Sequence, residues 1–344
     1  MKLRPPTLAD AEAVAALFND VSVALYGSPE VSANDVRLWL QAPGFDLERD
    51  AVVAEGEDRS VVGYGDLSDA SRDGRMIWID APTRLGDSET ANVILQELEV
   101  RAEERLASDG RLKAFVAERN TAYAAVVEAR GYALVRHSFR MEADLSYEPA
   151  TPEWPEGITV RPFRPGEDDE RFYEVQEETF ADQVDSEPMT YEEWRHWSFR
   201  DPFDADLWFL AEEGDELAGI LVARSERAGD ETVGWVSVLG VRRPWRRRGL
   251  GRALLLHSFH ALRARGKPRA GLGVDGSNPT GAVQLYEAVG MRVVRRSDHW
   301  EKKRRSLRLG SERPSHADDE PVSPDPPSAR SRRRTVTDAV VPPS

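Results

Sequence analysis

Hydrophobic and polar residues follow one another along this chain in a pattern that occurs twice. Each copy begins with a short β-like stretch, a turn and a helix with one apolar face. A β-hairpin with a Gly/Asp/Glu turn comes next, and the copy closes with a helix that ends in glycine and runs into a strand. The strand–turn–helix segments are LRPPTLADAEAVAALF from Leu3 and VRPFRPGEDDERFYEV from Val160. The hairpins are AVVAEGEDRSVVGYGDL from Ala51 and WFLAEEGDELAGILVAR from Trp208. The closing segments are YAAVVEARGYALVRHSF from Tyr123 and AVQLYEAVGMRVVRRSD from Ala282.

The two copies lie roughly 160 residues apart, an interval that indicates a duplicated domain and is far longer than a solenoid repeat. A Pro-rich stretch, EPATPEWPEG, separates them. We therefore predict a first domain at 1–150 and a second at 151–305, called the first and second half below. The segment 306–344 is rich in Pro, Ser and charge and has no apolar periodicity, so we predict that it is disordered.

The overall composition excludes several classes of protein. The chain has 344 residues, no cysteine and a formal net charge of -15. Disulfides, thiolate metal sites and cysteine nucleophiles are therefore excluded, and the acidic balance argues against nucleic-acid or membrane-surface binding. The start of the chain lacks a secretory signal pattern, and no apolar run approaches the length of a membrane span. We expect a cytoplasmic protein that works without a metal.

The candidate chemistry lies in the second half. The apolar run VGWVSVLGV from Val233 to Val241 predicts a buried strand, and it is followed by an arginine-rich turn with Gly249 and Gly251 and then by an amphipathic helix. A glycine-containing turn at a helix N-terminus binds anions through backbone N–H groups. Between Glu231 and Asp275 there are nine arginines, one lysine and no acidic residue. This indicates a phosphorylated ligand, although a solvated basic helix face is the alternative.

This stretch resembles a known family. The pattern Arg-x-x-Gly-x-Gly after a V-x-V strand is similar to the acetyl-CoA signature of the GCN5-related N-acetyltransferases (GNAT), and NPTGAVQLYEAVG from Asn278 is similar to their second motif. The resemblance covers 158–303, and the duplication is similar to the tandem acetyltransferases of the mycothiol synthase type. It implies an α/β layered fold with two tandem GNAT domains, each a mixed, mostly antiparallel sheet flanked by helices.

The resemblance also implies roles for individual residues, with acetyl-CoA as co-substrate. The backbone of Leu239 and Val241 is expected to pair with the pantetheine arm, and an N–H at or near Leu239 to polarise the thioester carbonyl. Tyr286 is expected to be the general acid that protonates the departing thiolate, because a phenol stays protonated at neutral pH. Asn278 is expected to face the cofactor from the other side. The turn expected to bind the pyrophosphate consists of Arg246, Arg247, Arg248, Gly249, Leu250, Gly251 and Arg252.

The general base and the acceptor site are less well defined. In enzymes similar to mycothiol synthase, a glutamate follows the strand glycine, whereas this chain has Trp235 after Gly234. Glu231 and, through a water, Ser237 are the remaining candidates for the base, with strand or surface filler as the alternative reading. The segment 180–199 combines carboxylates with aromatics, which suits a cationic acceptor but also a hydrophobic core.

The first half serves as an internal comparison. Its strand MIWIDAP is followed by TRLGDSET, which keeps one glycine and places Asp87 and Glu89 where a pyrophosphate would lie. Counting back from the shared glycine of the closing helix, Val127 stands in the place of Tyr286. We therefore predict that the first half is catalytically silent.

The prediction that follows is an acetyl-CoA-dependent N-acetyltransferase that acts on a primary amine of a small molecule through direct attack in a ternary complex. Two alternatives stay open: a CoA-binding sensor or scaffold without turnover, and a peptide or protein N-acetyltransferase. A monomer or a homodimer is expected, with neither nucleic acid nor membrane as a partner.

Overall fold

A computed structural model describes residues 1–304 except 70, 184, 201–202, 228–229 and 278–280. The segment 306–344, predicted to be disordered, and Asn278, predicted to face the cofactor, both lie outside the described residues.

Each half contributes six described strands and its own set of helices. The first half contains β1 (Lys2–Arg4), α1 (Ala11–Tyr26), α2 (Ala33–Leu40), α3 (Leu47–Asp50), β2 (Ala51–Glu55), β3 (Val61–Asp69), β4 (Met76–Asp80), α4 (Ser88–Glu103), β5 (Arg111–Ala117), α5 (Thr121–Ala129) and β6 (Ala133–Asp144). The second half contains β7 (Ile158–Pro162), α6 (Asp169–Phe180), α7 (Tyr191–Ser198), β8 (Trp208–Glu213), β9 (Glu216–Arg224), β10 (Val233–Val241), α8 (Leu250–Ala264), β11 (Arg269–Asp275), α9 (Ala282–Ala288) and β12 (Arg292–Lys303).

The described strands form one continuous sheet of twelve in the order β1-β2-β3-β4-β5-β12-β6-β11-β10-β9-β8-β7. Among these described strands, only the pairs β4–β5 and β10–β11 run parallel. The prediction of mixed, mostly antiparallel sheets flanked by helices, in two tandem copies, is confirmed.

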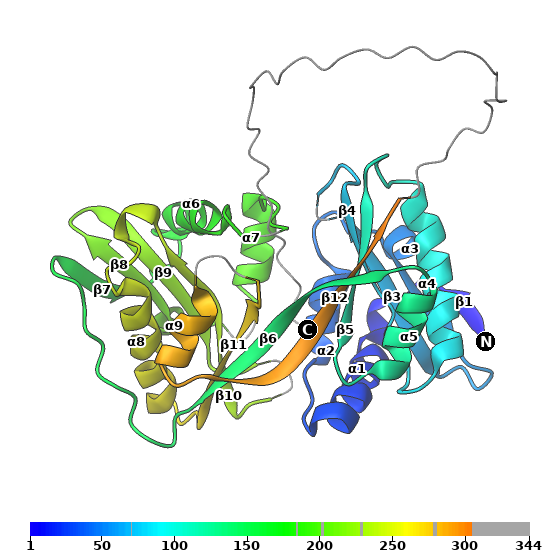
Figure 1. The fold of residues 1–344 in the computed structure, drawn as a ribbon, viewed down its shortest axis with the longest axis horizontal. Coiled ribbons are helices and arrows are strands. Elements are labelled where there is room, and N and C mark those ends of the chain that lie inside the picture. The colour runs from blue at the N-terminus through cyan, green and yellow to red at the C-terminus, as the bar shows by residue number, and fades with distance from the viewer. Residues whose placement is uncertain (70, 184, 201–202, 228–229, 278–280, 305–344) are drawn as a thin grey trace, which may run out of the picture.

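The two halves exchange their closing strands at the centre of the sheet. Strand β6 pairs with β11 of the second half on one side, and β12 pairs with β5 of the first half on the other. The two exchanged strands pair with each other, and in Figure 1 they cross between the two lobes. The cores follow the exchange, because Trp300 of β12 packs in the first-half core and Met141 of β6 packs in the second-half core. Pairing in this way leaves no free sheet edge between the halves.

The sheet is covered on both faces, as its strand sequences require. In β2, the fully buried Val52 packs with the core under α4 and α5, whereas its neighbour Val53 packs with the core under α1 and α2. Successive strand side chains point to opposite faces, so a strand buried on both sides reads as a continuous apolar run. Helices α8 and α9 cover the second half on the α4/α5 side, and α6 and α7 cover it on the opposite side.

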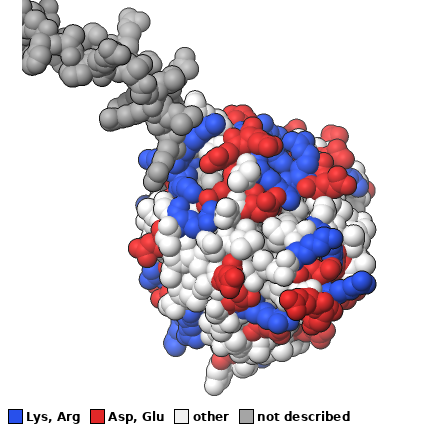
Figure 2. All heavy atoms as spheres, turned by 90° about the vertical axis from the view of Figure 1, so that its right-hand side faces the viewer, with Lys and Arg blue, Asp and Glu red and all other residues white. Residues whose placement is uncertain are grey.

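The surface carries charges of both signs. On the first-half face shown in Figure 2, lysines and arginines lie among aspartates and glutamates. In the described part of the chain, no helix has the length and apolarity needed to cross a membrane.

Candidate active site

An opening between β10 and β11 is the central feature of the second half. The two parallel strands pair from Val233 opposite Arg269 to Val236 opposite Leu272, and the ladder ends there. Beyond this point β10 pairs only with β9, with a bulge between Val236 and Val238, and β11 pairs only with β6. The two strands therefore separate. Ser237 and Gly273, although they lie in central strands, are exposed at the point of separation.

The separated edge of β10 can bind an extended chain. Leu239 and Val241, the predicted backbone partners of pantetheine, lie on the part of β10 that has lost its parallel neighbour, and both are half-buried. A strand edge with unpaired N–H and C=O groups forms main-chain hydrogen bonds with an added extended segment. The structure thus brings these two predicted residues to the opening.

The turn after β10 presents unpaired backbone donors at the start of α8. Gly249 is the N-cap residue at φ 88°, and no side chain caps the helix. Arg247 also lies in the left-handed region, at φ 66°, which is uncommon for a residue with a side chain. No described backbone carbonyl accepts a hydrogen bond from the N–H groups of residues 247–252. These donors and the positive end of the helix dipole form a site for an anion.

Gly251 has a different reason to be glycine. Its φ is not positive, and a Cβ placed there would lie at ordinary contact distances, 3.4 Å from Leu285 and 3.7 Å from Val241. The packing of the protein itself therefore does not demand glycine at this position. The contact with Leu285 also shows that α9, which carries Tyr286, lies beside the first turn of α8.

Most of the arginines around the turn are neutralised by carboxylates. Four of them form ion pairs: Arg242 with Glu178, Arg243 and Arg246 with Asp182, and Arg248 with Glu213. Among the described residues, no carboxylate pairs with Arg247 or Arg252. The positive charge available to a ligand therefore comes chiefly from these two side chains and from the backbone. Fewer arginines can bind a phosphorylated ligand than the sequence alone indicated.

Tyr286 lies on α9 with 9% of its surface exposed. Burial raises the pKa of its hydroxyl to about 12, because removal from water disfavours the phenolate. The group therefore carries its proton throughout the physiological range and can donate it. This is the protonation state that the predicted role as a general acid requires.

Trp235 occupies the place where the resemblance led us to look for a glutamate. Its ring lies over β11, because a Cβ added to Gly271 would come within 2.9 Å of it. The guanidinium groups of Arg227 and Arg140 lie 4.8 Å and 5.5 Å from the ring centroid. The position of the base is thus filled by an aromatic ring flanked by cations.

Glu231 is not brought to the opening. It is exposed and precedes β10, and its backbone carbonyl accepts a hydrogen bond from Lys267 Nζ at 2.8 Å. The opening begins at the other end of the paired stretch, near Ser237, six residues or about 20 Å along an extended strand. Ser237, the second candidate for the base, does lie at the opening.

The segment between α6 and α7 is held by ion pairs. Asp182 pairs with the turn arginines, and Asp185 is 4% exposed and pairs with Lys113, Arg111 and Arg136 around the first half. Trp194 is fully buried in the core under α6 and α7. Of the residues that suggested an acceptor pocket, Trp194 is a core residue and the two aspartates already have partners.

The first half has the same strand separation, but a larger side chain stands beside it. The β4–β5 ladder ends at Ile79 opposite Ala114, and the ladder registers make Trp78 and Lys113 the counterparts of Trp235 and Gly271. One step further along, Phe115 of β5 is the counterpart of the exposed Gly273 of β11. Sequence reasoning missed this difference. The signal was present in the glycines of AGLGV compared with KAF, but it needed the strand register to be interpreted.

The helix after the separated strand also differs between the halves. Helix α4 is capped by the Asp87 carboxylate, which accepts a hydrogen bond from the Thr90 N–H at 3.1 Å, and the Ser88 N–H bonds to the Gly86 carbonyl at 2.9 Å. A negative cap of this kind opposes binding of a phosphate. The counterpart of Tyr286, Val127, is fully buried.

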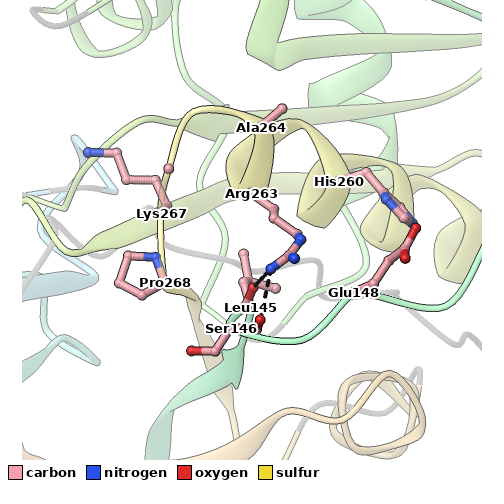
Figure 3. A pocket seen from close by; sticks show the side chains of 9 residues that line it. Leu145, Ser146, Glu148, His260, Arg263, Ala264, Lys267 and Pro268 are labelled. Atoms are coloured by element: carbon pink, nitrogen blue, oxygen red, sulfur yellow. Dashed lines mark hydrogen bonds between the residues drawn. The ribbon is translucent and has the colours of Figure 1, made fainter.

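A hollow of about 520 Å³ lies at the far end of α8 (Figure 3). Its lining includes Arg263, which donates to the Ser146 carbonyl at 3.0 Å, and His260. It adjoins the C-terminus of α8, whereas the opening and the turn lie at its N-terminus. The hollow is therefore separate from the candidate site.

Comparison with known proteins gives a consistent result. Residues 170–291 match the family described as Acetyltransferase (GNAT) family. The mycothiol acetyltransferase of Streptomyces scabiei is 32% identical over 298 residues, which cover 83% of this chain and 89% of that protein. The mycothiol acetyltransferase of Thermobispora bispora is 37% identical over 164 residues, or 46% of this chain and 55% of its own length.

Solved structures share the tandem arrangement. A GCN5-related N-acetyltransferase from Sphaerobacter thermophilus superposes with a TM-score of 0.71 at 30% identity, covering 88% of this chain and 95% of its own. A tandem GNAT protein from the clavulanic acid biosynthesis pathway has a TM-score of 0.66 at 17% identity, covering 88% of this chain and 98% of its own. The second likeness concerns the fold alone.

Proposed function

This chain belongs to the GNAT family of N-acetyltransferases, and from that premise we propose that it transfers an acetyl group from acetyl-CoA to a primary amine of a small molecule. The transfer takes place by direct attack in a ternary complex. Its active site lies in the second half, 151–305, and the first half, 1–150, is catalytically silent.

The observation that carries the choice of half is the opening beside Gly273. Both halves separate their parallel strands at the same register, but the first half carries the aromatic side chain of Phe115 at this place, whereas Ser237 and Gly273 are exposed in the second. Only the second half of the described chain combines this opening with an uncapped helix N-terminus and a tyrosine on the next helix. A thioester and an amine can therefore meet there.

The residues around the opening suit acetyl-CoA. Leu239 and Val241 pair with the pantetheine amides along the free edge of β10, and the N–H groups of residues 247–252 bind the pyrophosphate. The absence of a side chain at Gly251 allows the close approach that an anion needs, since the packing against Leu285 and Val241 would tolerate a Cβ and does not itself require glycine. Arg247 and Arg252 supply the remaining positive charge, and Asn278 keeps its predicted role on the facing side.

The chemistry is a single substitution at the thioester carbonyl. The lone pair of the amine forms the new C–N bond while the C–S bond breaks, and the sulfur takes its proton from the Tyr286 hydroxyl. An N–H of β10 at or near Leu239 stabilises the charge that develops on the carbonyl oxygen. The amine loses its proton to solvent, which reaches the opening at Ser237 and Gly273. Trp235 carries no proton-accepting group, so this scheme includes no carboxylate base.

An assay of thiol release from acetyl-CoA tests the proposal. The amine panel includes amino sugars, amino acids, peptides and a mycothiol-type amine, since the named relatives are mycothiol acetyltransferases. We expect turnover with at least one small amine. Turnover with peptides alone would favour the peptide or protein acetyltransferase, and tight acetyl-CoA binding without any turnover would contradict the proposed reaction.

A further inference from the structure

We propose that the first half has become a socket for the second: cations of β5 and β6 bind the carboxylate of Asp185 and thereby fix the segment that borders the acceptor side of the active site. Asp185 is a positioning residue in this proposal. The proposal rests on the function proposed above, because an acceptor side exists here only if the amine is acetylated in the second half.

The socket is a buried cluster of cations around one carboxylate. Asp185 accepts hydrogen bonds from Arg111 Nη2 at 2.8 Å and from Lys113 Nζ, and it forms an ion pair with Arg136 Nη2 at 2.5 Å. Lys113 is 1% exposed and Asp185 is 4% exposed. Removal of one member of a buried ion cluster leaves uncompensated charge, so the loss of any one of these partners disturbs the contact between the two halves.

Two cations of the socket, Arg111 and Lys113, lie on the paired part of β5, just before the strand separation of the first half. Lys113 and Phe115 are the counterparts of Gly271 and Gly273, the glycines beside the open site of the second half. The Lys113 ammonium also lies 4.7 Å from the centroid of the Trp78 ring, the counterpart of Trp235. The first half has thus kept the strand arrangement of the second and binds a side chain of the other half beside the separation.

The segment that enters the socket is tied to the opposite side of the opening as well. Asp182 pairs with Arg243 and Arg246 of the turn that follows β10. Asp185, three residues later, shares Arg136 with Asp275, which ends β11 and lies 3.2 Å from that guanidinium. The carboxylates of Asp182 and Asp185 are therefore bound by groups at the ends of β10 and β11.

The backbone at Asp185 supports a role for the ion pairs in shaping this segment. Its φ is 64°, in the left-handed region that residues with side chains seldom adopt. A conformation of this kind persists where surrounding contacts fix it, and the buried cations supply those contacts. The position of the acceptor-side wall is consequently set from the first half.

The test compares Asp185→Asn with the wild type in the full chain. We expect the KM for the best amine of the panel to rise at least tenfold, while the dissociation constant of acetyl-CoA measured by calorimetry stays within about threefold, because the cofactor turn is not part of the socket. Lys113→Met is also expected to raise the KM for the amine. Asp185→Glu keeps the negative charge, and its KM is expected to stay close to that of the wild type.

Asp50→Asn is the matched control. Asp50 is a buried carboxylate of the first half that pairs with Arg105 at 2.5 Å, within that half. If Asp185→Asn raises the KM of the amine no more than Asp50→Asn does, or weakens acetyl-CoA and amine equally, the proposal is wrong.

Hydrogen exchange separates failure of this proposal from failure of the proposed function. If the wild type turns over no amine, or if Asp185→Asn folds poorly, amide exchange in residues 181–190 is compared between Lys113→Met, Asp50→Asn and the wild type. Faster exchange there in Lys113→Met alone supports the socket. Equal exchange in the three proteins overturns it, whatever the activity.

Discussion

Phe115 and Gly273 hold the same place in the two halves: each directly follows the last residue of its strand that pairs with the parallel neighbour. In one half the place is filled by an aromatic ring, which packs edge-on against His299 at 4.9 Å between centroids. In the other half it is an exposed glycine. A single position thus carries an aromatic ring beside one strand separation and no side chain beside the other.

Replacement of Gly273 by phenylalanine is the most direct test of where catalysis occurs. Gly273→Phe places in the second half the ring that the first half carries, and we expect kcat/KM to fall by roughly a hundredfold or more, because a reacting atom that is displaced by an ångström or more loses its alignment. Steady-state kinetics with the best amine measure the effect.

Gly273→Ala is the control for this substitution. A Cβ at this position would meet only Trp235, at 3.9 Å, within the described residues, so we expect near-normal folding and a small kinetic change. Full activity of Gly273→Phe would place the reaction elsewhere.

The turn before α8 is tested by a substitution that separates stability from binding. Gly251→Glu puts a carboxylate in the first turn of α8, which stabilises a helix by about 0.3–1 kcal/mol. The same charge repels a pyrophosphate, and we expect the acetyl-CoA dissociation constant to rise by roughly a hundredfold. Calorimetry and thermal melting measure the two effects separately. Binding that is unchanged while the melting temperature rises would exclude this turn as the pyrophosphate site.

The role of Tyr286 is tested by removing its hydroxyl. Tyr286→Phe is expected to lower kcat by roughly 10²–10⁴-fold, the usual contribution of a general acid, and to leave acetyl-CoA affinity nearly unchanged. Since burial raises the pKa of Tyr286 to about 12, its proton is retained far above neutral pH. The wild-type rate should therefore show no loss from this group below about pH 10. An unchanged kcat in Tyr286→Phe would remove the residue from the mechanism.

The buried His299 is expected to make the protein sensitive to acid. Burial, followed by the charges of Arg136 and Lys113, lowers the pKa of His299 from 6.5 to about 3. Between these pH values the unfolded chain binds a proton that the folded chain does not, so stability falls as the pH is lowered through this range. From pH 6.5 to 5 the loss from this group is about 2 kcal/mol.

Urea unfolding of the wild type and of His299→Phe at pH 7.5 and pH 5 measures that loss. We expect the variant to lose less free energy of unfolding on acidification than the wild type. His260→Gln, on the surface of α8, should behave as the wild type. Equal acid sensitivity of His299→Phe and the wild type would show that another group is responsible.

Part of the site could be read from the chain because it depends on neighbours in sequence. The strand before the turn, Gly249 at a left-handed position and the helix after it are local features, and so is the difference between Tyr286 and Val127 once the two copies are aligned. The roles of these residues in binding and catalysis stay predictions that the experiments above address.

Other features depend on contacts between distant segments. The ion pairs of Arg246 and Arg248 join the turn to Asp182 and Glu213, more than thirty residues away, and they reduce the charge that the arginine run presents. In the socket, Asp185 contacts Lys113 and Arg111, which precede it in the chain by 72 and 74 positions. Composition and periodicity contain no record of such pairs, since any exposed carboxylate would fit the pattern equally well.

The sequence alone determined the duplication, the family and the presence of one arginine-rich turn with two glycines, because these follow from local patterns of apolar residues, glycines and charge. Only the tertiary structure decided which strand closes which half and which opening stays accessible. Strands β6 and β12 follow the same helix–glycine–strand pattern, and only the pairing of strands distant in the chain shows that each completes the sheet of the other half. The registers of the two parallel ladders likewise put Phe115 and Gly273 at the same place, where Gly273 is exposed.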